Sequence, residues 1–600
     1  MTPSVQALER DLQTGRFAHA EAGARTLLRE HPDDFGARVI LAVALGAQNR
    51  LREALPLYRQ LADEQPHEAA HLSNLATALR ECGELDEAEQ AYRRALALRP
   101  ADPALLANLG LLRWQRGDAV ETRNLMLEAC TAAPDMAEPR IYGALACHAC
   151  AEDEQARRLI ADCAHWPELD PVLEADLAMA ELQLEQVEAA HRRLQRLLHR
   201  APDSVRARVR MAGLLERLNR TDEAETMLAG IDLAADDEGS ALRAALQLRA
   251  GQPAQARAAY EQLVAHSPAA ACAPYHFALA KACDQLGDAE GAMRALDAAH
   301  ALQMQTAARL APDLVDPASA PLRIADQRIR AQERAGWRDS SGADSAQSPV
   351  FIVGFPRSGT TLLEQMLDAH PRLRSMDERA FVQDVIEGMA ALGFAYPRDL
   401  GRLDARSCTR LREIYWRRVA SVVRLEPGER LVDKNPLNIL RLPMLARIFP
   451  QAHFILALRH PLDVVLSCHM QSFRAPAFQF LCASLDRLAR GYGKAMDFWA
   501  DQSQVFDVRQ LQLRHEDLVG DPAAHARQLA GFLAIGEAES MLHFDQRVRE
   551  KGFIGTPSYA QVAETINPRG LGRWRRYRPW LEPVMPLLAP WCTRFGYRLD

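Results

Sequence analysis

A repeat of 34 residues is the feature of this sequence that most restricts its fold. Prolines recur at that spacing, or at twice that spacing, in the first half of the chain, at Pro32, Pro66, Pro100, Pro134 and Pro202. A unit of such a repeat buries its apolar face only against its neighbours. The sequence therefore predicts a stack of similar units in this half, rather than one compact core.

Matching positions inside the repeat indicate a pair of helices. Glycine or asparagine occupies the first position, at Gly15, Asn49, Gly83, Gly117, Asn219 and Gly251. Five residues later stands alanine, at Ala20, Ala54, Ala88, Ala156, Ala190, Ala224 and Ala256. Two further positions are apolar, held by Leu41, Leu75, Leu109 and Met211 and by Tyr58 and Tyr92. Glycine and asparagine suit a left-handed turn between helices, alanine allows close packing, and proline ends the second helix.

This unit resembles the tetratricopeptide repeat, a pair of antiparallel helices. About eight units can be traced over residues 1–302, and the last is displaced by two residues, at Pro268, Gly287 and Ala292. The resemblance implies an all-α superhelix with a groove that binds a peptide or a partner protein. A spacer, or a surface that forms a homodimer, is the alternative, and the sequence leaves both open.

The composition argues against several other classes of protein. Hydrophobic residues make up 48% and charged residues 25% of the chain, as in ordinary globular proteins, and the net charge of −7 gives no reason to expect nucleic acid as a partner. The sequence contains no run of about 18 apolar residues and no apolar signal segment at its start. With eleven scattered cysteines, we expect a cytoplasmic protein with reduced thiols and no membrane span.

Four residues have a spacing that resembles a zinc site, namely Cys147, Cys150, Cys163 and His165. The first two lie within a predicted repeat helix, where small buried cysteines are common. We therefore expect no metal site.

The period ends after residue 302, and the pattern then changes. Residues 303–347 are predicted to form a short helix between polar linkers. From residue 348 to residue 600, apolar strand-like runs alternate with helical segments. This alternation predicts an α/β domain with a central parallel sheet.

Residues 349–367, PVFIVGFPRSGTTLLEQML, predict a strand, a tight loop and a helix. Gly354 and Gly359 let the loop expose successive N–H groups, which form an anion site with the positive end of the helix. The glycine spacing equals that of the ATP-binding P-loop, but Thr360 stands where that loop has lysine. The pattern therefore disfavours a magnesium-dependent kinase and leaves a P-loop-like phosphate cradle that contains Arg357.

Residues 453–473, HFILALRHPLDVVLSCHMQSF, predict a second strand, turn and helix. Arg459 closes the strand, and Ser467 follows eight residues later on the helix. A guanidinium group and a hydroxyl group on one side of a strand end suit a second phosphate. Two separate sites fit a nucleotide that carries phosphates at both ends of its nucleoside, whereas ATP would need only one.

In this order the two segments resemble sulfotransferases, whose donor is 3′-phosphoadenosine 5′-phosphosulfate (PAPS). The resemblance implies that Arg459 and Ser467 bind the 3′-phosphate, that PAP is the product and that no metal is required. It also implies that the 5′-phosphosulfate is bound by the loop residues Pro356, Arg357, Ser358, Gly359, Thr360 and Thr361.

Residues 367–382, LDAHPRLRSMDERAFV, more closely resemble tyrosylprotein sulfotransferases. That resemblance makes Glu378 the catalytic base, Arg357 a transition-state cation, and Lys434 in RLVDKNPLNIL the catalytic lysine. Asp377 is the alternative base.

Residues 556–574, TPSYAQVAETINPRGLGRW, resemble the donor-binding tail of the same family. Ser558 then falls at a catalytic and donor-binding position, and Arg573 at a donor-binding one. The family has lysine where Arg573 stands, a replacement that keeps the charge but changes its geometry.

Three alternatives for the activity stay open at this point. The closer resemblance favours transfer to a tyrosine of a protein or peptide that the repeats recruit. Transfer to a carbohydrate, a lipid or a small molecule would use the same donor site, because function depends on the acceptor pocket rather than on the fold. The third alternative is a repeat scaffold whose α/β domain binds nucleotide without turnover.

Overall fold

The computed structural model describes residues 4–234, 236–316, 322–338, 348–551 and 570–599, without the side chains of 548–551. The chain divides into two compact units. Residues 1–207 and 268–271 form the first unit, and residues 208–267 and 272–600 form the second.

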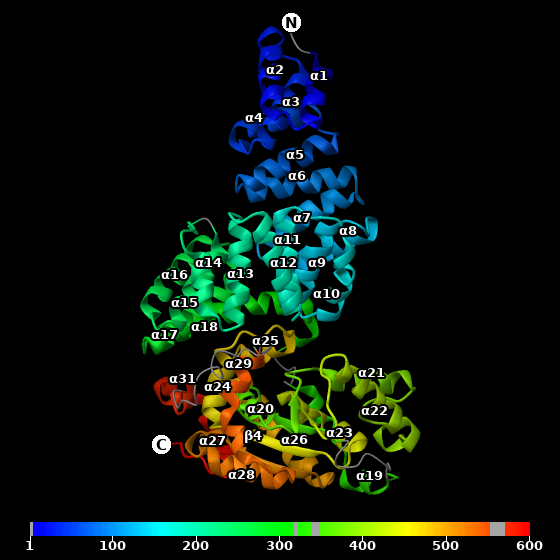
Figure 1. The fold of residues 1–600 in the computed structure, drawn as a ribbon, viewed down its shortest axis with the longest axis vertical. Coiled ribbons are helices and arrows are strands. Elements are labelled where there is room, and N and C mark those ends of the chain that lie inside the picture. Colours follow the sequence, from blue (N-terminus) through cyan, green and yellow to red (C-terminus); the bar gives the residue numbers. More distant parts are fainter. Residues whose placement is uncertain (1–3, 235, 317–321, 339–347, 552–569, 600) are drawn as a thin grey trace. The chain divides into compact units, whose positions relative to one another are not determined.

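Nine helix–turn–helix pairs occupy the described part of residues 4–310, which confirms the all-α repeat array (Figure 1). The helices are α1 (Val5–Gln13), α2 (Phe17–Glu30), α3 (Phe35–Ala47), α4 (Leu51–Glu64), α5 (Ala69–Glu81), α6 (Leu85–Leu98), α7 (Pro103–Gln115), α8 (Ala119–Ala132), α9 (Ala137–Ala149), α10 (Asp153–Leu159), α11 (Pro171–Gln183), α12 (Val187–Arg200), α13 (Val205–Arg217), α14 (Thr221–Leu228), α15 (Asp237–Arg249), α16 (Pro253–His266), α17 (Ala273–Gln285) and α18 (Ala289–Leu310). Two short 3₁₀ turns, η1 (Cys163–His165) and η2 (Ala269–Ala271), interrupt the series.

A residue with positive φ makes the turn inside each pair. All six predicted turn residues, from Gly15 to Gly251, have positive φ, and so does Gly287. Ala151 and Glu185, with φ of 63° and 65°, hold the same position in the two remaining pairs. The described part of the chain therefore has nine helix pairs, where the sequence pattern indicates about eight.

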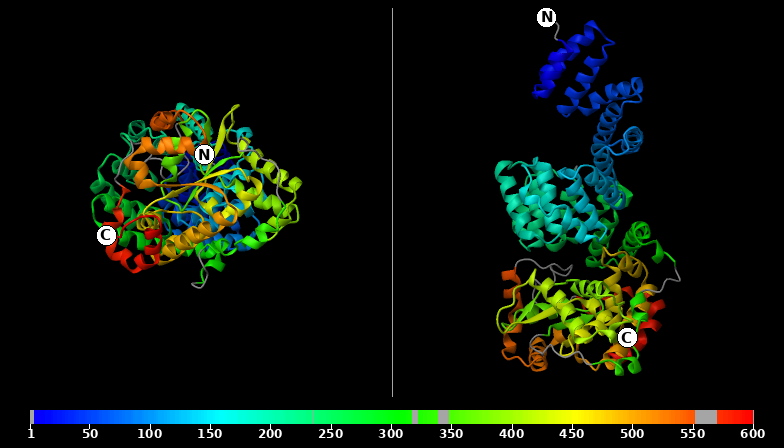
Figure 2. Two further views of the ribbon diagram at one scale, coloured as in Figure 1. Left: turned by 90° about the horizontal axis from the view of Figure 1, so that it is seen from below. Right: turned by 90° about the vertical axis from the view of Figure 1, so that its right-hand side faces the viewer.

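The alanine position is buried in the repeat array. All seven predicted alanines have an exposed fraction of 0%. In the first unit the packing continues from one pair to the next, and the dark blue and blue helices of Figure 2 show this stacking. Burial against neighbours is therefore what stabilises each pair.

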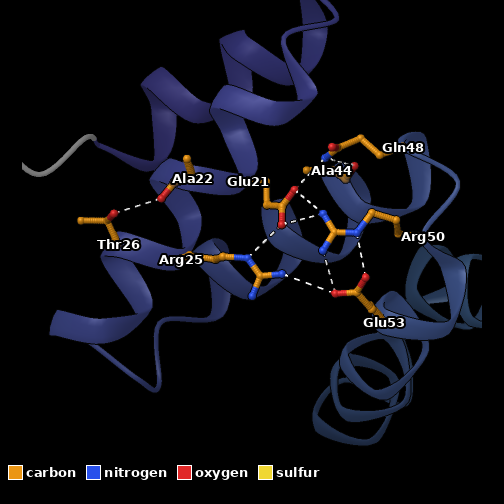
Figure 3. Close-up of polar contacts among 8 residues, drawn as sticks. All are labelled: Glu21, Ala22, Arg25, Thr26, Ala44, Gln48, Arg50 and Glu53. Atoms are coloured by element: carbon orange, nitrogen blue, oxygen red, sulfur yellow. Dashed lines mark hydrogen bonds and ion pairs between the residues drawn. The ribbon is translucent and has the colours of Figure 1, made fainter.

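Ion pairs at the turns add to this packing between neighbouring pairs. Arg50, which follows the turn residue Asn49, donates from Nη1 to Glu21 Oε2 at 2.8 Å and from Nη2 to Glu53 Oε2 at 2.7 Å. Arg25 donates to Glu21 Oε1 at 2.9 Å, so one carboxylate accepts from two arginines (Figure 3). Exposed pairs of this kind contribute little to stability one by one.

Five parallel strands form the sheet of the second unit, in the order β2-β3-β1-β4-β5. The strands are β1 (Val350–Gly354), β2 (Leu373–Ser375), β3 (Arg430–Lys434), β4 (His453–Leu458) and β5 (Arg509–Arg514). Val350 of β1 lies beside Val432 of β3 and His453 of β4. The prediction of an α/β domain with a central parallel sheet is confirmed.

Helices cover both faces of this sheet (Figure 1). They are α20 (Thr360–Asp368), α21 (Phe381–Ala391), α22 (Ala405–Ala420), α23 (Leu442–Ile448), α24 (Pro461–His469), α25 (Pro476–Cys482), α26 (Leu485–Val505), α27 (His515–Gly520), α28 (Pro522–Leu533), α29 (Phe544–Lys551), α31 (Arg578–Leu581) and α32 (Met585–Arg594), together with α19 (Ala331–Ala335). The 3₁₀ turns are η3 (Pro312–Leu314), η4 (Arg323–Asp326), η5 (Leu400–Arg402), η6 (Pro436–Arg441), η7 (Ala538–His543), η9 (Arg573–Tyr577) and η10 (Glu582–Val584).

Alternate residues of β1 point into two hydrophobic cores, as the period of a strand requires. Val350 and Ile352 pack with α20 and α28 on one face. Phe351 and Val353 pack on the other face with α22 and α26. Side chains of α17 and α18 belong to this second core, so the last repeat helices and the sheet share one hydrophobic interior.

The described residues offer no helix that is both long and apolar enough to cross a membrane. All eleven cysteines lie in described segments, and none of them forms a disulfide. Within those segments, no three or more side chains of the metal-ligating types lie close enough together to hold a metal ion. Cys147 and Cys150 therefore belong to no such group.

Enlarging an interior alanine tests the packing inside the pairs. We expect Ala88→Leu in α6 to lower the free energy of unfolding of the first unit by about 1–3 kcal/mol, because the site is fully buried against neighbouring helices. Ala97→Leu, on the exposed side of the same helix, is the matched control and should change it little. Denaturant titrations followed by far-ultraviolet circular dichroism measure both, and equal effects would contradict the packing account.

Candidate functional site

A cavity of about 1430 Å³ lies in the second unit at the carboxyl ends of β1 and β4. Its wall combines the loop after β1, the residues after β3 and β4, residues 570–576, and repeat helices α15–α17. This volume exceeds the 300–1,000 Å³ of ordinary ligand pockets. The cavity therefore has room for two ligands side by side.

The loop after β1 is shaped to hold an anion. Arg357 has a φ of 70°, and Gly359, with a φ of 86°, caps helix α20. A Cβ atom on Gly359 would lie 2.4 Å from His515 Nδ1, so both the backbone conformation and the space require glycine. Thr360 and Thr361 begin α20 on the cavity wall, where the helix presents N–H groups and its positive end.

Most predicted donor-binding residues meet at this cavity. Those on its wall are Pro356, Arg357, Gly359, Thr360, Thr361, Arg459, Ser467 and Arg573. Ser358 is buried in the loop and does not line the cavity. Ser558 lies outside the described residues.

Direct contacts join the two predicted phosphate sites. Arg357 Nε donates to Ser467 Oγ at 3.2 Å, and Arg459 Nη1 donates to the Arg357 carbonyl oxygen at 3.3 Å. The loop after β1 and the start of α24 thus form one continuous surface.

This surface concentrates positive charge. Burial lowers the pKa of Arg357, and the cations Arg459 and Arg573 lower it further. Burial also lowers the pKa of Arg459, with Arg573 again acting in the same direction. The Nε atoms of Arg459 and Arg573 are buried and have no acceptor in the described part of the chain. Buried donors of this kind are normally satisfied, so a bound anion fits this wall.

Two carboxylates neutralise Lys434, which has an exposed fraction of 0% and does not line the cavity. Its Nζ atom lies 2.6 Å from Glu378 Oε1 and 3.2 Å from Glu364 Oε2. Burial acts to lower the pKa of Lys434, but the attraction of Glu364 and Glu378 outweighs it and raises the pKa. Lys434 therefore stays charged, with Glu378 between it and the cavity.

Glu378 and Asp377 occupy different environments. The Glu378 side chain is 42% exposed and lines the cavity. Asp377, with a φ of 59°, is buried and does not line it. Of these two carboxylates, only Glu378 faces the cavity.

The sequence patterns missed several residues of the site. Glu364 lies one helical turn after the loop, on α20. All residues of this helix are buried, and a carboxylate in such a helix is the only sign of a special role. Arg249, Lys281 and Asp284 line the cavity from α15 and α17. Nothing in a regular repeat could have indicated them. Burial lowers the pKa of Lys281. The cations Arg249 and Arg357 lower this pKa further, and Glu216 acts in the opposite direction.

Two kinds of protein family match this chain. Residues 349–539 match the Sulfotransferase family. Tetratricopeptide-repeat families match residues 9–69, 76–117, 181–248 and 242–306.

Related proteins match about two fifths of this chain. An uncharacterized protein of Aquifex aeolicus is 28% identical over 40% of this chain, and the match spans only 32% of that protein. Protein-tyrosine sulfotransferase 1 of Danio rerio is 30% identical over 41% of this chain and 72% of its own length. Protein-tyrosine sulfotransferase A of Caenorhabditis elegans is 25% identical over 45% of this chain and 73% of its own length.

Two solved structures resemble part of this chain. The sulfotransferase domain of the Synechococcus PCC 7002 olefin synthase covers 44% of this chain and 99% of that domain, at 24% identity and a TM-score of 0.32. A tetratricopeptide repeat protein of Parabacteroides merdae covers 37% of this chain and 89% of that protein, at 17% identity and a TM-score of 0.32.

A buried carboxyl group beside Lys434 predicts a pH-dependent stability. Burial raises the pKa of Asp433 to about 7, although the Tyr415 hydroxyl donates to it at 2.7 Å and opposes the shift. The folded protein then binds a proton that the unfolded chain releases near pH 4. Asp433 therefore makes its full contribution to the free energy of unfolding below about pH 4, and this contribution is lost as the pH rises to about 7.

We expect the free energy of unfolding of the wild type, relative to Asp433→Asn, to fall between pH 5 and pH 7 by up to about 1.4 kcal/mol per pH unit, and to level off above. Denaturant titrations of both proteins across this range measure the difference. Asp497→Asn, at an exposed position of α26, is the control and should show no such slope. A pH-independent difference for Asp433→Asn would show that Asp433 is ionised throughout.

Proposed function

Because this chain belongs to the sulfotransferase family, we propose that it transfers the sulfuryl group of PAPS to the hydroxyl of a tyrosine in a protein or peptide. The observation that carries the donor assignment is the joining of two cationic sites in one cavity. Arg357 and Thr360 belong to the first site, and Arg459, Ser467 and Arg573 to the second. Two such sites suit a nucleotide with phosphate groups at both ends of its nucleoside.

The chain's own groups hold this donor in the proposal. The N–H groups at the start of α20 and the Arg357 guanidinium face the 5′-phosphosulfate, and Arg459, Ser467 and Arg573 face the 3′-phosphate. Ser558 belongs to the donor-binding set by resemblance alone. When bound, PAPS supplies an activated sulfuryl group and a phosphate leaving group, so the protein needs no metal for this chemistry.

Glu378 is the proposed general base. It takes the proton of the acceptor hydroxyl, whose oxygen forms the new bond to sulfur. The bond between sulfur and the 5′-phosphate oxygen breaks, and that oxygen keeps the electron pair and leaves on PAP. Arg357 stabilises the negative charge that develops on the transferring and leaving oxygens. Lys434 is buried behind Glu378, so we assign it the role of holding this carboxylate.

Tyrosine is the proposed acceptor for two reasons. The relatives from Danio rerio and Caenorhabditis elegans are named protein-tyrosine sulfotransferases. In addition, the wall beyond the donor site contains the apolar side chains Leu248, Phe277, Leu437, Met470, Phe473 and Phe478. Such a surface favours an aromatic ring over a sugar. The repeats would then recruit the polypeptide, and the cytoplasmic location and a homodimer stay predictions.

Transfer of radiolabelled sulfate from PAPS tests the proposal. We expect label in tyrosine peptides and none in glycans or lipids from one mixed panel. Glu378→Gln should lower kcat by about 10²–10⁴-fold because the base is lost, whereas Glu387→Gln, at an exposed position of α21, should leave it unchanged.

Label confined to glycans, lipids or small alcohols would contradict the tyrosine acceptor but keep the sulfotransferase. Binding of nucleotide without label in any acceptor would favour the scaffold alternative. Full activity of Glu378→Gln would remove Glu378 as the base.

A further inference from the structure

Helix α17, the first helix of the ninth repeat pair, forms one wall of the catalytic cavity. Phe277, Ala278, Lys281, Asp284 and Gln285 of this helix line the cavity. Their spacing of one, three, three and one residues places them on one face of a helix. Ala282, about 100° around the helix from Lys281, is fully buried in a core of the repeats.

The end of this helix contacts the segment that carries Arg573. Asp284 Oδ2 lies 3.3 Å from Arg573 Nη1, and Asp284 Oδ1 accepts from the buried Tyr577 hydroxyl at 2.7 Å. The Asp284 carbonyl oxygen accepts from Arg576 Nη1 at 2.7 Å. One residue of the repeat array therefore contacts three residues of the transferase segment.

The other side of the same segment is fixed by the transferase domain itself. Asp463, in the first turn of α24, accepts from the backbone N–H groups of Gly572 at 2.7 Å and Trp574 at 2.9 Å. Arg459 donates to the Gly570 carbonyl oxygen. Arg573 thus lies between two aspartates, one on α24 and the other on α17.

The position of the Arg573 guanidinium depends on this arrangement. Its Nη1 atom is held by Asp284, while its buried Nε atom has no acceptor in the described part of the chain. A guanidinium group held at one nitrogen presents its remaining N–H groups in a fixed direction. Here they are available to an anion on the cavity wall that Arg573 shares with Arg459.

We infer that the ninth repeat pair is a structural part of the donor site, and that Asp284 is a positioning residue that aims Arg573 at the donor's 3′-phosphate. This inference rests on the proposed function, since it assigns Arg573 to the donor. Without Asp284, the arginine side chain would have to be ordered by the ligand itself, and that ordering weakens binding. The repeats would then serve the reaction directly, besides any recruitment of acceptor.

The test compares Asp284→Ala, Arg573→Ala and the double variant in the full chain, with PAP as the probe in equilibrium calorimetry. We expect Asp284→Ala to raise the Kd of PAP about tenfold, the effect of losing one charge-assisted contact. The double variant should bind no more weakly than Arg573→Ala, because Asp284 acts through Arg573. In steady-state assays, the KM for PAPS should rise while kcat and the acceptor KM stay within about twofold of wild type.

Two further variants separate positioning from folding. Asp284→Asn keeps the shape and the acceptor for Tyr577 but loses the charge, so it should fold normally and still weaken PAP binding. Asp288→Ala removes the cap of α18 and its pair with Arg257 in the same repeats, and it should leave the Kd of PAP unchanged.

Unchanged PAP binding in Asp284→Ala or in Arg573→Ala would overturn the inference. The inference would also be overturned if the losses of PAP affinity from Asp284→Ala and Arg573→Ala simply added in the double variant. An equal rise in the Kd of PAP for Asp288→Ala would overturn it too. Failure of the wild type to bind PAP would instead overturn the proposed function, so the two failures are distinguishable.

Discussion

Parallel pairing of β1 with β3 on one side and β4 on the other is the constraint on which the candidate site depends. Because parallel strands end at the same edge of a sheet, the residues that follow β1 and β4 meet there with the last residue of β3. Arg357, Arg459 and Lys434 come from segments up to about a hundred residues apart, and this register alone brings them together. Close approach is built into the backbone, since a Cβ atom on Gly354 would lie 2.7 Å from the Ala457 carbonyl oxygen.

Charge is divided unevenly across this edge. On one side burial lowers the pKa of Arg357 and of Arg459, and the positive charge of Arg573 acts on both in the same direction. On the other side Lys434 lies between Glu364 and Glu378 and offsets the charge of one of these two carboxylates. The first side favours a bound anion, and the second holds a carboxylate at the cavity wall without adding to the positive field. This separation is what two different tasks, binding a multiply charged donor and accepting a proton, would require.

The sequence predicts the parts of this structure that depend on local signals. Gly15 and Ala20 recur with a period that indicates the helix pairs, and the run around Gly354 and Gly359 indicates strand, loop and helix. Contacts between distant segments leave no such trace. Asp284 and Arg573 are separated by 289 residues, and Glu364 reaches Lys434 only after the chain has passed through two more strands. The resemblance to sulfotransferases makes Glu378 and Lys434 candidates, but it could not indicate that Lys434 is buried behind Glu378, nor that a repeat helix lines the cavity.

Binding of PAP and of adenosine 5′-phosphate to the full chain, compared in magnesium-free buffer, tests the central claim most directly. The claim is that one cavity holds two anion sites matched to a nucleotide with phosphates at both ends. It predicts that PAP binds at least tenfold more tightly than adenosine 5′-phosphate, because each charged contact to the second phosphate adds affinity. Equal affinity for the two nucleotides, or binding that requires magnesium, would contradict it.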